Sequence, residues 1–165
     1  MSRKGDQAYE LVEVTLDASV PLPERVTETS ISSLVGHVLA SEQASGEWTI
    51  GFRMTSDVQM QTMHLEFMGL DSSTDIMTFP YEDLWREQSI SRQSTIRGGD
   101  IVISIDRARE QAQDEGWDVA DEVFFLVCHG ILHLLDWDDT SDSKRVAMLD
   151  RQRELLSTWD RTTSW

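Results

Sequence analysis

Two histidines and the acidic residues that follow them form the part of this chain best suited to chemistry. His129 and His133 are four residues apart in a stretch with helical apolar spacing, so their side chains would project from one face of a helix. Neutral imidazole suits zinc, and a catalytic zinc is held by three protein ligands with a further position left open. The pair therefore predicts a metal site that needs one more ligand nearby.

Three aspartates after the second histidine are candidates for that ligand: Asp136, Asp138 and Asp139. Asp136 would still lie on or near the helix, whereas the other two follow it and can turn back toward the metal; we rank Asp139 first. Zinc held there would lower the pKa of a bound water and act as a Lewis acid. Asp136 or Asp138 could then accept the water proton, although either carboxylate could instead end the helix or orient a ligating imidazole.

Spacing alone leaves other interpretations open. Two histidines on an apolar helix can simply be packed and hydrogen-bonded within a core. The chain has one cysteine, Cys128, which excludes a multi-cysteine zinc pattern, so a metal here would be held by histidines and carboxylates. Cys128 would point away from the neighbouring His129 on a helix, and we expect it to be a buried small apolar residue rather than a nucleophile.

Length and composition predict one folded domain over residues 1–165, because 39% of the residues are apolar and 27% are charged. No apolar run approaches the roughly 20 residues that span a bilayer, and the first ten residues lack the apolar segment of a signal peptide. We therefore expect a cytoplasmic protein without a membrane partner.

The charge balance is strongly acidic, with 30 acidic residues against 14 basic ones and a formal charge of −16. Such a charge repels a polyanion unless basic side chains are gathered locally, and DNA is not an expected partner. The lysines are Lys4 and Lys144, the other cations being arginines, so the acidic surface could also reflect adaptation to high salt.

Apolar patterns along the chain predict the elements that must position the histidines. The predicted strands are 9–17, 47–55, 74–80 and 100–106, with a polar loop at 81–97. The predicted helices are 24–44, one that begins at 57 after a cap, 107–113, 119–135 and one that begins after Thr140 or Ser141. The helix that carries the histidines is apolar around most of its circumference, which indicates burial on most sides.

The residues around the histidines resemble a known family. The string H-G-I-L-H-L-L-D-W-D-D at 129–139 is similar to the H-G-x-L-H-L-x-G-x-D-H signature of the YbeY family of endoribonucleases. A second block, T-D-I-M-T-F-P-Y at 74–81 followed by G-D-I-V-I-S at 99–104, is similar to that family's strand pair in order and spacing. The resemblance extends over roughly residues 48–157 and includes Met148 and Gln152.

This resemblance implies both a fold and a function. The implied fold is a single α+β domain, a small mixed four-stranded sheet packed with about four to five helices, with one zinc ion on a helix and its following turn. The implied function is a zinc-dependent, single-strand-specific endoribonuclease in ribosomal RNA maturation. Its partners would be ribosomal RNA and the small ribosomal subunit, and its tasks 3′-end processing of small-subunit RNA and ribosome quality control.

The chain departs from the family pattern at two motif positions. Asp139 stands where the family has its third histidine, and Asp136 stands where it usually has glycine. An aspartate can ligate zinc through oxygen, but its negative charge lowers the Lewis acidity of the metal relative to a neutral histidine. Residues 65–73 also lack the arginine that family members typically carry before the first strand of the pair.

Other arginines could supply contacts to RNA phosphates. The candidates are Arg53 on a predicted strand and Arg86, Arg92 and Arg97 in the loop before the last strand. An exposed, solvated loop is the alternative interpretation of the last three.

Two other functions remain open from the sequence. A different metal-dependent hydrolase is one, because helical histidine pairs with an aspartate also occur in zinc peptidases; Gly130, however, stands where H-E-x-x-H has its glutamate. The other is a non-catalytic, ribosome-associated protein with a structural zinc. A closed site with four protein ligands, including Asp136 or Asp138, would indicate that function.

Overall fold

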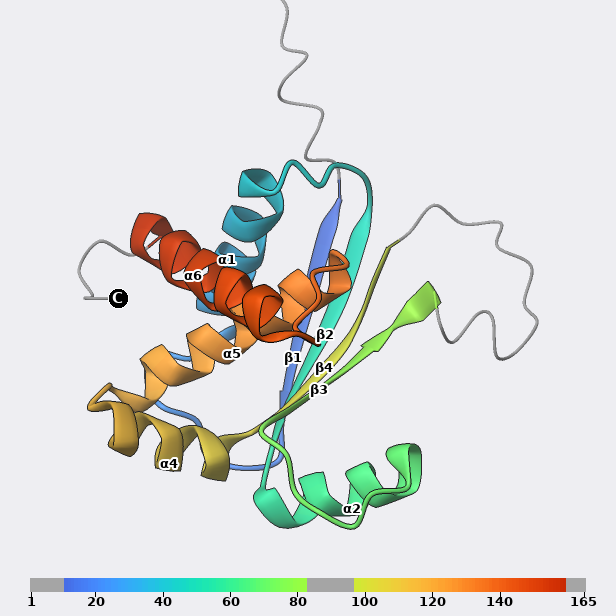
Figure 1. Ribbon diagram of the computed structural model, residues 1–165, viewed down its shortest axis with the longest axis vertical. Coiled ribbons are helices and arrows are strands. Elements are labelled where there is room, and N and C mark those ends of the chain that lie inside the picture. Colours follow the sequence, from blue (N-terminus) through green and yellow to red (C-terminus); the bar gives the residue numbers. More distant parts are fainter. Residues whose placement is uncertain (1–10, 83–96, 160–165) are drawn as a thin grey trace, which may run out of the picture.

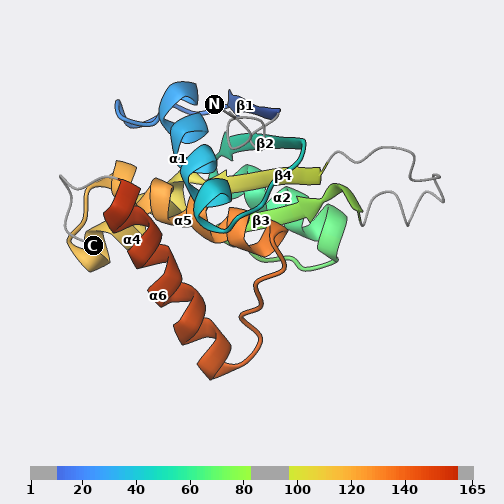
Figure 2. The same ribbon diagram turned by 90° about the horizontal axis from the view of Figure 1, so that it is seen from above.

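The computed structural model describes residues 11–82 and 97–159. Its sheet has four strands in the order β1-β2-β4-β3, which the view in Figure 2 shows from one edge to the other. The first three of these are parallel and β3 is antiparallel to β4, so the sheet is mixed, as predicted. The strands are β1 (Val12–Ala18), β2 (Trp48–Thr55), β3 (Ile76–Pro80) and β4 (Arg97–Ser104).

Helices cover both faces of this sheet (Figure 1). In the described ranges they are α1 (Glu28–Ser41), α2 (Asp57–Met68), α4 (Ile105–Glu115), α5 (Val119–Leu134) and α6 (Asp142–Trp159). Helices α1 and α5 lie on one face, α6 packs against the outside of both, and α2 lies on the opposite face. This arrangement confirms the predicted α+β fold class.

Alternation along β4 divides the apolar side chains between the two faces. Ile101 and Ile103 are fully buried in the main core with α5. On the opposite face, Val102 forms a small second cluster with Met60 of α2 and Met77 of β3. Successive side chains of a strand point to opposite faces, so both sides of β4 must be apolar. Strand β4 is therefore buried on both faces.

Helix α5 lies close against the sheet at the point where the histidines begin. A Cβ atom on Gly130 would lie 2.9 Å from the side chain of Ile101 and 3.2 Å from that of Ile76. A glycine here lets the helix backbone approach β4 and β3 without forcing those side chains to move. His129 is consequently held beside the edge strand β3.

The boundaries of β4 differ from the predicted range of 100–106. The strand begins at Arg97 and includes Gly98, which has a φ of +137°. A Cβ atom added there would lie 1.8 Å from the Thr49 carbonyl oxygen, so only glycine fits. It ends at Ser104 because the side chain of Ser104 accepts a hydrogen bond from the Arg107 N–H and caps α4. Apolar residues continue to alternate beyond Ser104, so the sequence pattern does not reveal that the strand ends there.

Side-chain caps also begin α1 and α6, the second at a residue predicted from the sequence. Thr27 begins α1 with a reciprocal capping box, and the Ser141 hydroxyl accepts a hydrogen bond from the Lys144 N–H at the start of α6. Helix α2 also forms where predicted, but Val58, Leu65 and Met68 are largely exposed on it. Within the described residues, no helix combines the length and apolar character needed to cross a membrane.

Candidate metal centre

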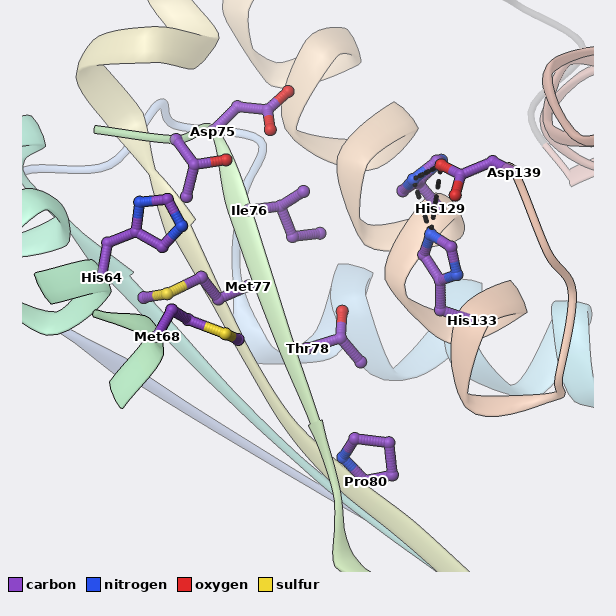
Figure 3. A pocket seen from close by; sticks show the side chains of 11 residues that line it. His64, Met68, Asp75, Ile76, Met77, Thr78, Pro80, His129, His133 and Asp139 are labelled. Atoms are coloured by element: carbon purple, nitrogen blue, oxygen red, sulfur yellow. Dashed lines mark hydrogen bonds and ion pairs between the residues drawn. The ribbon is translucent and has the colours of Figure 1, made fainter. Parts of the chain in front are cut away.

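Three side chains from α5 and the turn after it converge on one point (Figure 3). The Nε2 atoms of His129 and His133 are 3.0 Å apart, and one carboxylate oxygen of Asp139 lies 3.5 Å from each. In the described part of the chain, these residues form the one group of three or more metal-ligating side chains with ligand atoms within 4.8 Å of one another. The three residues ranked first from the sequence are thus brought together.

Hydrogen bonds select the tautomer of both imidazoles. The Nδ1 atom of His129 lies 2.8 Å from the side-chain oxygen of Gln152, whose amide group donates to the Phe125 carbonyl at 3.1 Å and so keeps that oxygen toward the histidine. Nδ1 of His133 lies 3.1 Å from the Trp137 carbonyl oxygen. Both oxygens can only accept, so each Nδ1 carries the hydrogen and each Nε2 presents a lone pair.

The facing lone pairs fit a bound cation. Two neutral Nε2 atoms 3.0 Å apart, with a carboxylate oxygen close to both, repel one another unless a proton or a metal ion lies between them. Burial, as the largest influence, lowers the pKa of His129 and disfavours the proton. Two imidazole nitrogens and one carboxylate oxygen are a donor set that zinc accepts.

The turn after α5 carries Asp139 back to the helix. The chain reverses at Asp136, which has a left-handed φ of +69° and is exposed. Glycine, asparagine and aspartate adopt this conformation most readily, which accounts for an aspartate at a motif position where glycine is usual. The N–H of Trp137 then donates to the Leu132 carbonyl at 3.0 Å and closes the turn.

The side chain of Trp137 anchors the same turn to two other helices. Its indole N–H donates to the Glu42 carboxylate at 2.7 Å, and the second oxygen of Glu42 pairs with the Arg151 guanidinium at 2.6 Å. Glu42 follows α1 and Arg151 lies on α6. The carbonyl that orients His133 is therefore held by residues distant in the sequence.

The other two aspartates of the motif are placed differently. Asp138 accepts hydrogen bonds from the N–H and hydroxyl of Thr140 and from Lys144, and these contacts, that from Lys144 first, lower its pKa to about 2. Neither Asp136 nor Asp138 lines the groove described next. Their catalytic roles stay predictions, as does the role of Asp139 as a metal ligand.

A groove of about 550 Å³ leads to the three converging atoms. It follows the edge strand β3, with Ile76 and Thr78 directed toward the histidines and Met77 and Met68 on the far side of the strand (Figure 3). Its lining in the described residues is His64, Met68, Thr74, Asp75, Ile76, Met77, Thr78, Pro80, His129, His133 and Asp139. The metal centre is thus accessible from the surface.

The two candidate RNA-binding arginines within the described residues, Arg53 and Arg97, do not line this groove. Arg53 is exposed on the sheet face opposite α5 and lies 3.8 Å from Asp17, and Arg97 stacks over the Trp48 ring at 5.9 Å. Arg86 and Arg92 lie outside the described residues. The RNA-binding role of all four stays a prediction.

Sequence reasoning missed the function of Gln152, although the residue belongs to the recognised block. Its side chain is fully buried and joins His129 to the backbone of α5. The available signal was a polar residue at a core position, because Met148, Gln152 and Leu155 share one helical face. Cys128, by contrast, is fully buried as expected, and burial raises its pKa to about 12.

Replacing Gln152 with leucine is expected to weaken metal binding by about 10- to 100-fold, because outer partners of ligating histidines contribute this much to affinity. The same change should lower the free energy of unfolding by about 1–3 kcal/mol through lost buried hydrogen bonds. Competition with a chromophoric chelator measures the first quantity and urea denaturation the second. Met148→Leu, a buried change on the same helical face, is the control, and equal metal affinities for the two variants would contradict the orienting role.

Comparison with known proteins supports the family resemblance. A family model described as endoribonuclease YbeY matches residues 15–160. A protein of that name from Gloeobacter violaceus is 32% identical over 145 residues, which cover 88% of this chain and 73% of the relative. Another from Renibacterium salmoninarum is 33% identical over 149 residues, which cover 90% of this chain and 92% of the relative.

A solved structure supports the fold as well. The solution structure of a Thermotoga maritima protein superposes with a TM-score of 0.60, covering 90% of this chain and 89% of that chain at 20% identity. The family match includes both strands of the β3–β4 pair, the histidine helix and the turn that carries Asp139. The chain therefore belongs to the YbeY family of endoribonucleases.

Proposed function

We propose that this chain is a zinc-dependent endoribonuclease that cleaves single-stranded RNA during ribosomal RNA maturation, at the 3′ end of the small-subunit RNA. The observation that carries the proposal is the convergence of His129, His133 and Asp139 at an open groove in a member of this family. Ribosome quality control and a cytoplasmic location follow from the same assignment.

The three converging residues would hold the metal. A bound zinc supplies Lewis acidity that polarises a phosphate oxygen and lowers the pKa of a coordinated water. Gln152 and the Trp137 carbonyl keep each Nε2 directed at the ion, and the Asp139 carboxylate neutralises part of its charge. Thr78, which points into the same groove, is placed to donate a hydrogen bond to a phosphate or ribose oxygen.

The charge of the groove makes the metal important for RNA binding. Among its described lining residues there is no arginine or lysine, whereas Asp75 and Asp139 are acidic. A polyanion is repelled by such a surface, so the metal ion would be the main local attraction for a phosphate. RNA affinity at this groove is therefore expected to depend on metal loading.

The described residues favour an open site over a structural one. A closed site needs a fourth protein ligand, yet Asp138 is engaged by Thr140 and Lys144, and Asp136 is exposed at the turn. A zinc peptidase is also disfavoured, because Gly130 lies against Ile101 where a glutamate base would be required.

Cleavage assays with defined RNAs test the proposal. The zinc-loaded protein is expected to cleave an unpaired RNA segment and to spare the same sequence in a duplex. Chelation or His129→Ala should abolish cleavage, while the exposed-residue control Glu110→Gln should retain it. Binding of one zinc without cleavage of unpaired ribosomal RNA would sink the nuclease assignment and favour the structural-zinc alternative.

A further inference from the structure

A second cavity, of about 320 Å³, adjoins the groove at His129. It is lined mainly by α4, α5 and α6, is partly open to solvent, and shares Asp75, Ile76 and His129 with the groove. Its remaining lining in the described residues is Gln111, Asp114, Glu115, Glu122, Phe125, Leu126, Leu149 and Gln152. Among the described residues, four carboxylates and no lysine or arginine therefore line this cavity.

Glu122 distinguishes this cavity from a solvated acidic surface. The residue is 4% exposed, and its carboxyl group makes no hydrogen bond or ion pair with the described residues. Burial, followed by repulsion from Asp75 and Glu115, raises its pKa to about 7. A buried carboxylate without a partner is costly, so a ligand that supplies positive charge would stabilise it.

The surrounding groups are oxygen ligands or donors that a cation with bound water can use. The Gln111 amide donates to one oxygen of Asp75 at 3.1 Å, which leaves the other oxygen available to the cavity. Asp114 and Glu115 approach from α4, and the buried Gln152 from α6. The titratable groups around Glu122 are therefore Asp114 and Glu115 on α4, Asp75 before β3, and His129 on α5 itself.

We propose that this cavity binds a hydrated divalent cation, Mg²⁺ or Mn²⁺, through Asp75, Glu115 and Glu122. Mg²⁺ retains several waters and is held by only one or two direct carboxylates. Among the described residues, the oxygens of these three carboxylates do not all lie within 4.8 Å of one another. They are therefore too far apart to bind one ion directly together, and bound waters would bridge the remaining distance. The cavity volume of about 320 Å³ corresponds to about ten waters of roughly 30 Å³ each, which leaves room for a hydrated ion.

The two sites would select different metals. The oxygen ligands of the cavity suit a hard cation, whereas the imidazoles of the groove suit zinc. A cation beside Asp75 would also reduce the negative potential that the shared wall presents to an RNA phosphate. The cation site itself does not depend on the proposed RNA cleavage, so the two proposals can fail separately.

Titration of the zinc-loaded full chain with Mn²⁺ tests this site, with water-proton relaxation and calorimetry as readouts. Wild type is expected to bind one Mn²⁺ in addition to zinc, and Glu122→Gln, which keeps the side-chain volume, should weaken it by at least about tenfold. The matched control is Glu110→Gln, an exposed carboxylate on α4 outside the cavity. Near pH 6.5, binding should release a proton, seen as a heat that varies with the ionisation enthalpy of the buffer.

Crystals soaked in Mn²⁺ keep the test independent of variant folding. An anomalous peak between Asp75, Glu115 and Glu122 supports the site, and Glu115→Gln should weaken the peak. Equal Mn²⁺ affinity in Glu122→Gln and wild type would overturn the proposal. So would Mn²⁺ found only at the histidines or on exposed carboxylates.

Discussion

Asp139→Ala is expected to weaken zinc binding by about 100- to 1,000-fold. Zinc sites with four protein ligands contribute about 10–16 kcal/mol, so one ligand accounts for roughly 3–4 kcal/mol, and each tenfold in affinity is about 1.4 kcal/mol. The variant keeps both imidazoles, which remain oriented by Gln152 and the Trp137 carbonyl. Competition with a chromophoric chelator gives the affinity, and elemental analysis gives the zinc content.

The neighbouring aspartates provide matched controls for this prediction. Asp138→Ala removes the pair with Lys144 at the start of α6 and should leave zinc affinity within about threefold. Asp136→Gly should keep zinc and raise the free energy of unfolding by up to about 1 kcal/mol, because glycine accepts the φ of +69° without strain. Loss of zinc from either variant, or its retention by Asp139→Ala, would show that the third ligand is misassigned.

Glu122→Gln is expected to stabilise the metal-free protein at pH 8 and to have little effect at pH 4. The pKa of Glu122 is about 7 in the folded protein against 4.5 for an ordinary glutamate. The folded state therefore holds the proton more tightly, and wild-type stability is lost as the pH rises from about 4.5 through 7. At pH 8 the difference between variant and wild type should reach about 2–3 kcal/mol.

Urea denaturation at several pH values in metal-free buffer measures this difference. Its dependence on pH is the diagnostic feature, because a simple packing effect of the substitution would be constant. Mn²⁺ at ten times its dissociation constant should raise the free energy of unfolding of the wild type by about 1.4 kcal/mol, and that of the variant by much less. If the difference in unfolding free energy between variant and wild type does not change between pH 4 and 8, the pKa of Glu122 is not raised in the folded protein.

Local patterns explain why the histidine pair, most elements and the candidate ligands could be predicted from the sequence. The spacing of His129 and His133 defines their shared face without knowledge of any other element. Asp139 follows the helix closely enough to return to it, and its carboxylate lies 3.5 Å from both histidines. The α+β class with a mixed sheet followed from the family resemblance and is confirmed.

Features that depend on residues distant in the sequence could not be predicted from local patterns. Gln152 reaches a histidine 23 residues earlier, and Glu122 owes its unusual pKa mainly to burial and to charges on other elements. The order β1-β2-β4-β3 and the exposure of Val58 on α2 likewise depend on which faces meet in three dimensions. Periodicity reports that a face is apolar, but it does not report which element covers that face.

The dependence of the histidines on α6 has a consequence for the order of events during synthesis. A growing chain that has emerged only through α5 contains His129 and His133 but neither Gln152 nor Arg151. Until α6 follows, one imidazole lacks the acceptor that selects its tautomer, and the turn lacks its clamp to Glu42. Because a domain generally folds as a unit, tight binding at the proposed metal site is expected only after α6 has been made. If the proposed function holds, a nascent chain would therefore gain nuclease activity only after α6 has been made.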